Sequence, residues 1–276
     1  MLYKLLFSKA FDITLPSNNT SMLQLLTDKY FADYQKLLNR DLTDALPMGE
    51  TPVFAPDSFG FYTSVASVYS SKIEGEAIDA DSYLKHRYMG VKFKPDYTKK
   101  IDDLFNAYAF ARDKLLTVDN LLTAHTLLTK NILRNVQRGK VRTGVIYVTD
   151  ENERIMYIGA NPSTVKREFE KLLEDIGFLL SQDLTIHQTF YYAAYIHLLF
   201  LNIHPLDDGN GRSARLLEKW FLAQKLGEQA WYIPSEKYYY RHLSDYYKNL
   251  QRLGLEYESL NYDNALPFLL MLGESL

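Results

Sequence analysis

Residues 204–215, which read HPLDDGNGRSAR, constrain the fold of this chain more than any other segment. Just before them, apolar side chains recur at the i, i+3, i+4 and i+7 spacing of a helix with one buried face, namely Ile196, Leu199, Phe200 and Ile203. That helix should end at His204, because the residue before a proline disfavours the α region. A second helix is expected over 209–225, with Gly227 as its C-cap. The sequence therefore predicts two core helices joined by a short loop that contains glycine.

This junction has the residue types of an anion site. The first N–H groups of a helix bind anions, and Gly209 and Gly211 would let a phosphate approach closely. Arg212 and Arg215 are three residues apart and would lie on one helix face, where two guanidinium groups could hold a polyphosphate.

Two further side chains at the same junction are suited to chemistry. Asp208 could hold a Mg²⁺ that bridges phosphates, and His204 could take a proton from a hydroxyl. Taken singly, Asp208 could instead be an N-cap or pair with Arg212, and His204 could be a half-buried loop histidine. So many suitable residues in one loop favour a functional site.

The rest of the chain is predicted to be helical with one β-hairpin. Residues 144–149 and 154–158 are rich in strand-forming side chains and flank a polar four-residue turn. We therefore expect an all-α protein with a small hairpin, divided into an N-terminal helical region (1–90), a core (91–255) and a tail packed on the core (256–276). The other helices are expected at 21–39, 59–73, 80–88, 96–116, 118–134, 163–180, 185–203 and 235–253.

Composition narrows the function classes. The 276 residues include no cysteine, which excludes disulfides, cysteine nucleophiles and thiolate metal sites and fits a cytoplasmic protein. The net charge of −3 gives no sign of nucleic-acid contact. Residues 1–7 are too short for a signal-peptide core, and the apolar stretch 190–203 is too short to span a membrane.

At residues 204–215 the sequence resembles the Fic family, whose motif reads H-x-F-x-[D/E]-G-N-G-R-x-x-R. Only the third position departs, where Leu206 replaces the usual Phe with another apolar side chain. The resemblance extends over about 70–252. Residues 143–158 look like the family's β-hairpin flap, and Tyr246-Tyr247 resembles an aromatic pair that lies near the adenine in relatives.

This resemblance implies a Fic-type helical bundle that transfers AMP from ATP to a Ser, Thr or Tyr hydroxyl of a target protein. His204 would deprotonate the hydroxyl, and Asp208 would hold Mg²⁺. On the flap, Met156 and Tyr157 would pin the target, unless they are ordinary strand side chains. The residues implied to bind the nucleotide are Gly209, Asn210, Gly211, Arg212, Arg215, Tyr246 and Tyr247.

A second pattern resembles the inhibitory helix of a Fic subclass. Residues 70–75, SSKIEG, match [S/T]-x-x-x-E-[G/N] with Ser70 and Glu74 at the defining positions. The resemblance implies that Glu74 pairs with Arg215 in the place of the γ-phosphate and so restrains the enzyme.

Other functions stay open at this level. The fold could use UTP, GTP, CDP-choline or a phosphate donor, it could mainly remove AMP, or it could only sense nucleotide. Self-modification and a homodimer are also open, and the target protein is unknown. The remaining histidines have no metal-ligand spacing, His197 reads as a core or boundary residue, and Lys140 and Arg142 read as isolated basic residues.

Overall fold

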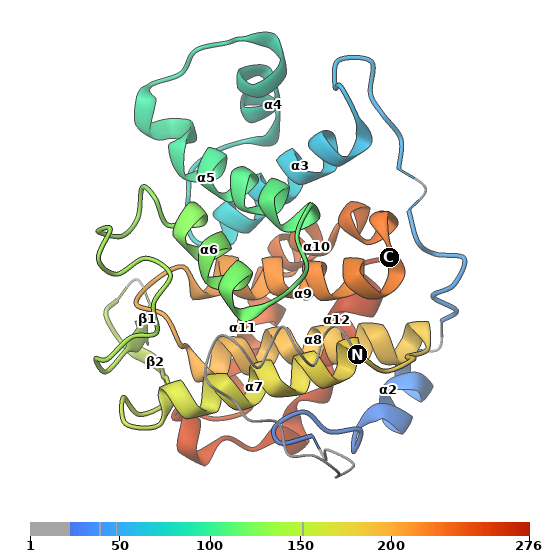
Figure 1. The fold of residues 1–276 in the computed structure, drawn as a ribbon, viewed down its shortest axis with the longest axis vertical. Coiled ribbons are helices and arrows are strands. Elements are labelled where there is room, and N and C mark those ends of the chain that lie inside the picture. Colours follow the sequence, from blue (N-terminus) through green and yellow to red (C-terminus); the bar gives the residue numbers. More distant parts are fainter. Residues whose placement is uncertain (1–22, 39, 48, 151) are drawn as a thin grey trace.

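The computed structural model describes residues 23–38, 40–47, 49–150 and 152–276 (Figure 1). Residues 1–7, and residues 21, 22 and 39 of the helix predicted over 21–39, lie outside these ranges. In order, the α-helices and strands are α2 (Phe31–Leu38), α3 (Ser58–Ile73), α4 (Ala80–Met89), α5 (Pro95–Arg112), α6 (Val118–Leu128), β1 (Tyr147–Thr149), β2 (Ile155–Ile158), α7 (Val165–Leu180), α8 (Ile186–Ile203), α9 (Asn210–Leu226), α10 (Ser235–Arg241), α11 (Leu243–Gln251) and α12 (Leu266–Glu274).

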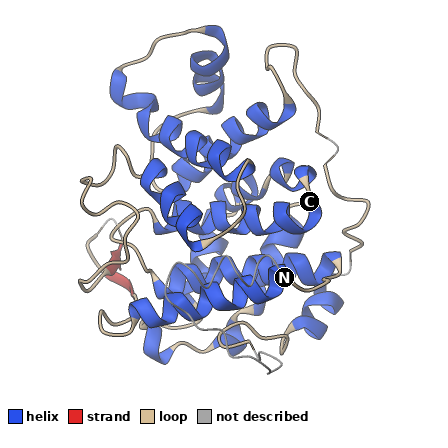
Figure 2. Cartoon of the chain, viewed as in Figure 1, coloured by secondary structure: helices blue, strands red, loops and turns tan. Residues whose placement is uncertain are grey.

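The described chain is a helical bundle with one two-stranded antiparallel sheet, so the predicted fold class is confirmed (Figure 2). Helix α8 lies at its centre and packs against α2, α7, α9 and α12. The apolar stripe that predicted α8 is only part of its buried surface, because polar residues such as His197 and Asn202 are buried as well. None of the described helices is long and apolar enough to cross a membrane.

The helix expected over 21–39 is shorter in the described residues, where only α2 is helical. The Asp175 carboxylate of α7 accepts hydrogen bonds from the backbone N–H groups of Gln24, Leu25 and Leu26, each at 2.8 Å. Because the Asp175 side chain binds these N–H groups, residues 24–26 are not helical and lie against α7. This segment is called the strap below.

The helix expected over 118–134 ends at Leu128, and the following residues form turns. Asp103 of α5 accepts from both the backbone N–H of Asn131 (2.8 Å) and its side-chain amide (2.7 Å). The Arg138 side chain donates to the carbonyl oxygens of Leu133 and Lys130. Tertiary hydrogen bonds therefore replace the helical bonds that local sequence alone would favour.

The single helix expected over 235–253 is broken into α10 and α11 at His242, whose backbone leaves the helical region (φ −111°, ψ 37°). The His242 ring packs on Tyr238, with ring centroids 4.1 Å apart, and its Nδ1 contacts the Tyr238 carbonyl oxygen at 3.0 Å. Tyr246 and Tyr247 lie on α11, after this break.

The predicted β-hairpin is present, but its first strand is shorter than expected and covers only Tyr147–Thr149, while the second covers Ile155–Ile158. Strands β1 and β2 pair antiparallel, with Val148 opposite Tyr157 and an irregularity between Val148 and Thr149. Near its base the hairpin is attached to the C-terminal segment, because the Ile158 N–H donates to the Leu255 carbonyl oxygen at 2.8 Å. These contacts hold the hairpin beside the junction of α8 and α9 (Figure 1).

Candidate active site

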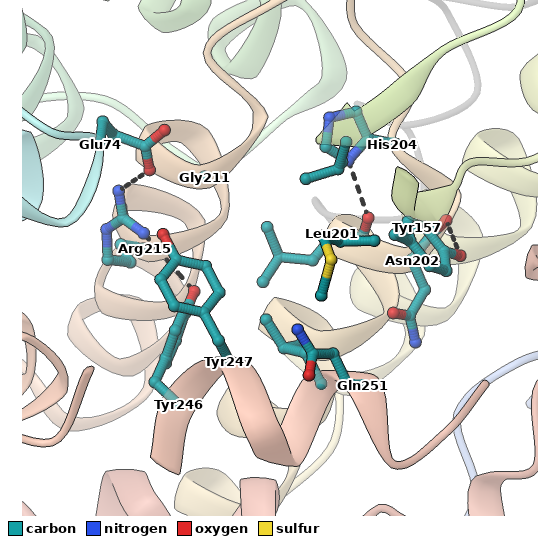
Figure 3. A pocket seen from close by; sticks show the side chains of 13 residues that line it. Glu74, Tyr157, Leu201, Asn202, His204, Gly211, Arg215, Tyr246, Tyr247 and Gln251 are labelled. Carbon is teal, nitrogen blue, oxygen red and sulfur yellow. Dashed lines mark hydrogen bonds and ion pairs between the residues drawn. The ribbon is translucent and has the colours of Figure 1, made fainter. Parts of the chain in front are cut away.

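A pocket lies between the start of α9, the hairpin and α11 (Figure 3). It brings together many of the residues that the sequence singled out, namely Glu74, Met156, Tyr157, His204, Gly211, Arg215, Tyr246 and Tyr247. Its remaining lining comes from residues that sequence reasoning missed, namely Val148, Leu201, Asn202, Leu250 and Gln251. The missed residues carry no motif, and only the fold brings them to the pocket.

His204 ends α8 in the left-handed conformation, with φ 52° and ψ 58°. Its Nδ1 lies 3.1 Å from the Leu201 carbonyl oxygen. A carbonyl only accepts, so Nδ1 carries the hydrogen and Nε2 keeps a free lone pair. Burial lowers the pKa of His204 to about 4, and the nearby Arg142 guanidinium acts in the same direction. The ring is therefore neutral at pH 7 and able to accept a proton.

The loop after His204 is fixed from within. The Asn210 amide oxygen accepts from the Leu206 N–H at 3.0 Å, and its amide nitrogen donates to the Leu206 carbonyl at 2.8 Å. The Asn210 side chain is thus used to close the loop, and it is Asn210's backbone that remains to meet a ligand. Leu206, at the position where the resemblance departs from the family motif, is 1% exposed and fills the expected packing role.

The first turn of helix α9 has backbone N–H groups without helical acceptors, the arrangement that suits an anion. Gly209 is the N-cap with φ 75°, a conformation that glycine adopts easily. The first helical hydrogen bond runs from the Ser213 N–H to the Gly209 carbonyl oxygen at 2.9 Å. The N–H groups of Asn210, Gly211 and Arg212 precede that bond and have no helical acceptor. The simpler interpretation of Asp208 as N-cap is wrong, since Gly209 occupies that position.

Asp208 is exposed at the mouth of this loop, and its Oδ1 accepts from the Gly209 N–H at 2.5 Å. No cluster of three or more His, Asp or Glu that could hold a metal occurs among the described residues. A single carboxylate nevertheless suits Mg²⁺, which keeps several waters and takes phosphate oxygens as its other ligands. The Asp208 backbone carbonyl is held by His125, whose Nε2 lies 2.9 Å from it.

His125 was missed because its sequence neighbourhood carries no motif. The Gly139 N–H donates to its Nδ1 at 2.9 Å, so Nε2 carries the hydrogen and donates to Asp208. Burial lowers the pKa of His125, which keeps this imidazole neutral. His125 therefore fixes the backbone that presents Asp208.

Both arginines in the first turns of α9 are buried, Arg212 at 4% exposure and Arg215 at 1%. Arg215 donates to the Glu74 carboxylate at 2.5 Å, to the Ser70 hydroxyl at 2.8 Å and to the Ser70 carbonyl oxygen at 3.0 Å. Burial by itself raises the pKa of Glu74, but the Arg215 and Arg212 guanidinium groups lower it by more. Glu74 is thus an ionised carboxylate on a buried cation.

The Glu74 carboxylate also lies against the start of α9. A Cβ atom on Gly211 would collide with Glu74 Oε1 and would lie 3.3 Å from Arg215 Nη1. Only a glycine at this position lets an anionic group approach the helix terminus so closely. The structure therefore has a carboxylate seated where an anion-binding helix start and a guanidinium group meet (Figure 3).

Glu76 is a second carboxylate that the sequence analysis overlooked. Its Oε1 lies 3.4 Å from Arg212 Nη2 and 2.6 Å from Lys100 Nζ. The simple alternative that Arg212 pairs with Asp208 is not what the described residues form, because the ion pair of Arg212 is with Glu76. The segment after α3 thus supplies one carboxylate to each arginine, and the Glu-Gly-Glu spacing of residues 74–76 was the available signal.

Arg142 is not an isolated basic residue, as the sequence suggested, but a buried one with 3% exposure. Its guanidinium donates to the carbonyl oxygens of His204 (2.7 Å), Gly144 (2.6 Å) and Ala160 (2.5 Å). It therefore ties both ends of the hairpin segment to the end of α8. His204 is 62 residues away from Arg142, so no local pattern could have revealed the bond between them.

The aromatic residues that line the pocket differ in their exposure to solvent. Tyr246 is 1% exposed, whereas Tyr247 is 40% exposed and donates from its hydroxyl to the Ile73 carbonyl oxygen at 3.0 Å. On the hairpin, the Tyr157 hydroxyl donates to the Asn202 carbonyl oxygen at 2.6 Å, while Met156 lines the same pocket. Burial raises the pKa of Tyr157, so its phenol stays neutral.

The fold and pocket together define a helical protein in which backbone N–H groups without helical acceptors lie at a helix start near a neutral histidine. Residues 115–222 match the model of the Fic/DOC family, and the chain thus carries a Fic/DOC family domain. A Fic family protein from Desulfovibrio desulfuricans has a similar fold, with a TM-score of 0.67 at 18% identity over 92% of this chain and 74% of that one.

Two curated relatives carry the name protein adenylyltransferase. The Fic protein of Nematostella vectensis is 23% identical over 64% of this chain, and fic-1 of Caenorhabditis briggsae is 29% identical over 37%. The matches cover 41% and 18% of these relatives, so the chain spans less than half of their length.

Proposed function

We propose that this protein transfers AMP from ATP to a hydroxyl side chain of a target protein and that Glu74 restrains the reaction. One observation carries the proposal: an ionised carboxylate occupies the junction of Arg215 and the α9 terminus, 2.5 Å from the guanidinium. That junction has the chemistry of a phosphate site. The names of the two curated relatives support the same reaction.

The nucleotide would lie with its phosphates on the N–H groups of residues 210–212. Arg212 and Arg215 would hold the β- and γ-phosphates, and the ribose and base would extend toward Tyr247 in the apolar part of the pocket. Asp208 would hold Mg²⁺, which neutralises phosphate charge when bound. In this arrangement the α-phosphate lies near His204.

His204 would act as general base. Its free Nε2 lone pair takes the proton of the target hydroxyl while that oxygen bonds to the α-phosphorus. The bond from the α-phosphorus to the bridging oxygen breaks, and pyrophosphate leaves. The chain's own contribution is positioning and charge neutralisation. The hairpin would pair with an extended target segment, with Met156 beside the acceptor residue.

Glu74 would restrain transfer by occupying Arg215, because a γ-phosphate cannot share the guanidinium with a carboxylate at this distance. Displacing Glu74 should therefore be necessary for productive binding of ATP. Since Glu74 and His204 line the same pocket, removal of AMP from a modified target with water as acceptor is a second candidate reaction.

The test uses Mg²⁺ and ATP labelled at the α-phosphate with four proteins: wild type, Glu74→Gly, Glu74→Gly/His204→Ala and Glu76→Gln. Label on protein, including on the enzyme itself, is expected strongly in Glu74→Gly and not in the double variant. Glu76→Gln removes a nearby carboxylate that contacts Arg212, and its labelling should rise far less.

Two outcomes would count against the proposal. Strong label on the wild type would keep the transfer reaction and reject the restraint by Glu74. An absence of label in all four proteins, with ATP binding verified by calorimetry, would reject AMP transfer. The same proteins should then be tested with labelled UTP, GTP and CDP-choline as donors and with AMP-modified protein as substrate.

A further inference from the structure

A row of buried polar side chains runs behind Arg215, away from the pocket. Arg215 Nη1 lies 3.5 Å from the Tyr246 hydroxyl, which lies 3.0 Å from His197 Nε2. His197 Nδ1 in turn lies 2.7 Å from Glu218 Oε2. The row joins three helices, α8, α9 and α11, and His197 and Glu218 are completely buried.

The chemistry of the partners fixes the direction of these hydrogen bonds. A carboxylate only accepts, so His197 donates from Nδ1 to Glu218; in the neutral imidazole, Nε2 then has a lone pair. The Tyr246 hydroxyl therefore donates its hydrogen to His197, and its oxygen lone pairs face the Arg215 N–H. The Tyr239 hydroxyl also donates to Glu218 Oε2, at 2.8 Å. Glu218 Oε2 thus accepts two hydrogen bonds, from His197 and from Tyr239.

This row is independent of the segment that restrains Arg215. The other hydrogen bonds that Arg215 makes within the described residues go to Ser70 and Glu74, at the end of α3. Tyr246 belongs instead to α11. If a phosphate displaces Glu74, the Tyr246 oxygen still faces the guanidinium and limits its rotation.

Burying a carboxylate and an imidazole without solvent costs free energy, and apolar residues of similar volume would often stabilise the core as well. The buried pair of His197 and Glu218 is therefore better explained by the side chain that it orients than by a gain in stability. We propose that Tyr246, His197 and Glu218 are positioning residues that orient Arg215 toward the terminal phosphates of a nucleoside triphosphate once Glu74 is displaced. The inference rests on the proposed function.

If Tyr246, His197 and Glu218 position Arg215, their loss should affect the binding of ATP and of AMP differently. If the row acts only through Arg215, its loss should weaken binding of ATP, whose terminal phosphates meet the guanidinium. AMP, which lacks those phosphates, should be affected little. A row with a merely structural role would weaken ATP and AMP alike, because both would lie in the same damaged pocket.

The experiment measures the dissociation constants of Mg²⁺-ATP and of AMP by calorimetry in the Glu74→Gly background. Tyr246→Phe removes only the hydroxyl and keeps the ring that lines the pocket. We expect about a tenfold weaker binding of ATP, the size of one lost hydrogen bond to a charged group, and less than about a twofold change for AMP.

Two further variants separate positioning from packing. His197→Gln can still accept from Tyr246 and donate to Glu218, so it should keep most of the ATP affinity, whereas His197→Leu should reproduce the loss. Tyr191→Phe is the matched control. Tyr191 lies on the same helix as His197, and its hydroxyl donates to the Thr27 carbonyl oxygen at 2.7 Å. Removing this hydroxyl should change the dissociation constant of neither ATP nor AMP.

A double-mutant cycle gives the decisive comparison. In a Glu74→Gly/Arg215→Ala background, Tyr246→Phe should have no further effect on ATP affinity, because the residue through which it acts is gone. An undiminished effect there, or equal losses for ATP and AMP, would overturn the inference and leave the proposed function standing. If Glu74→Gly binds no ATP at all, both are overturned.

Discussion

The side chain of His204 is held in one orientation by the conformation of its own backbone. A left-handed conformation at a residue other than glycine is uncommon, and here it lets the α8 chain turn while the ring Nδ1 bonds back to Leu201. Arg142 holds the carbonyl oxygen of the same residue. His204 is thus fixed at its backbone and at its ring, with only Nε2 left free.

The lowered pKa of His204 leads to a prediction about pH. A general base must be neutral, and a histidine with an ordinary pKa would lose half of its activity near pH 6.5. Because burial lowers the pKa of His204 to about 4, the neutral form persists well below that pH. We expect kcat/KM of the Glu74→Gly protein to stay flat from pH 8 to about 5.5 and to fall only at lower pH.

The measurement is the rate of labelling at low ATP concentration across this pH range, with circular dichroism at each pH to verify that the protein stays folded. A half-point near pH 6.5 would show that His204 titrates like an exposed histidine in the free enzyme. The Glu74→Gly/His204→Ala protein provides the background rate.

At the scale of elements, the hairpin and the end of α8 behave as one unit. Besides the bonds of Arg142 to both, the Ala160 N–H donates to the Ile203 carbonyl oxygen at 3.2 Å, and the Arg142 N–H donates to the Pro205 carbonyl at 2.9 Å. Gly159 lies so close to His204 that a Cβ atom there would be 2.9 Å from the His204 Cβ. The hairpin therefore cannot shift at its base without disturbing the site.

We expect Arg142→Met to lower the free energy of unfolding by about 3 kcal/mol, because several buried carbonyl groups lose a charged donor at once. Arg154→Met, in the turn of the hairpin, is the matched control. The Arg154 side chain is 73% exposed and its ion pair within the described residues is with Asp150, so its loss should cost less than about 0.5 kcal/mol. Urea unfolding measures both, and equal costs would contradict the structural role of Arg142.

At the scale of the whole molecule, one hydrophobic core continues from the strap to the last helix. It includes Leu26 and Tyr34 near the beginning, the buried residues of α8 and α9 at the centre, and Phe268 and Leu272 of α12. A smaller cluster joins α3, α4 and α5 and consists of Val68, Ile78, Tyr83 and Ile101. The division into 1–90, 91–255 and 256–276 remains a prediction from sequence, and the continuous core favours joint unfolding of all three.

We therefore expect the last helix to stabilise the entire protein. Leu272→Ala removes a fully buried side chain and should lower the free energy of unfolding by about 3 kcal/mol. Leu270→Ala on the same helix removes a partly exposed one and should cost about 1 kcal/mol.

Circular dichroism and the fluorescence of Trp220 and Trp231 should report one coincident transition in both proteins. An earlier transition in the Leu272→Ala protein, seen by only one probe, would show that α12 unfolds separately.

By itself, the sequence determined those features whose causes are local. The periodicity of apolar residues predicted α8, and the glycines at 209 and 211 marked the start of α9. The residue types at 204–215 likewise indicated the pocket. Short-range spacing is enough for each of these, because the interacting groups are neighbours along the chain.

Tertiary structure decided the rest, for the physical reason that the deciding partners are far apart in sequence. Asp175 binds the N–H groups of the strap 149 to 151 residues away, and Arg142 binds His204 across 62 residues. The pairing of His197 with Glu218, and of both with Tyr246 behind Arg215, likewise follows from how three helices pack. A buried polar group must find its partner wherever the fold provides one, and local sequence does not encode that choice.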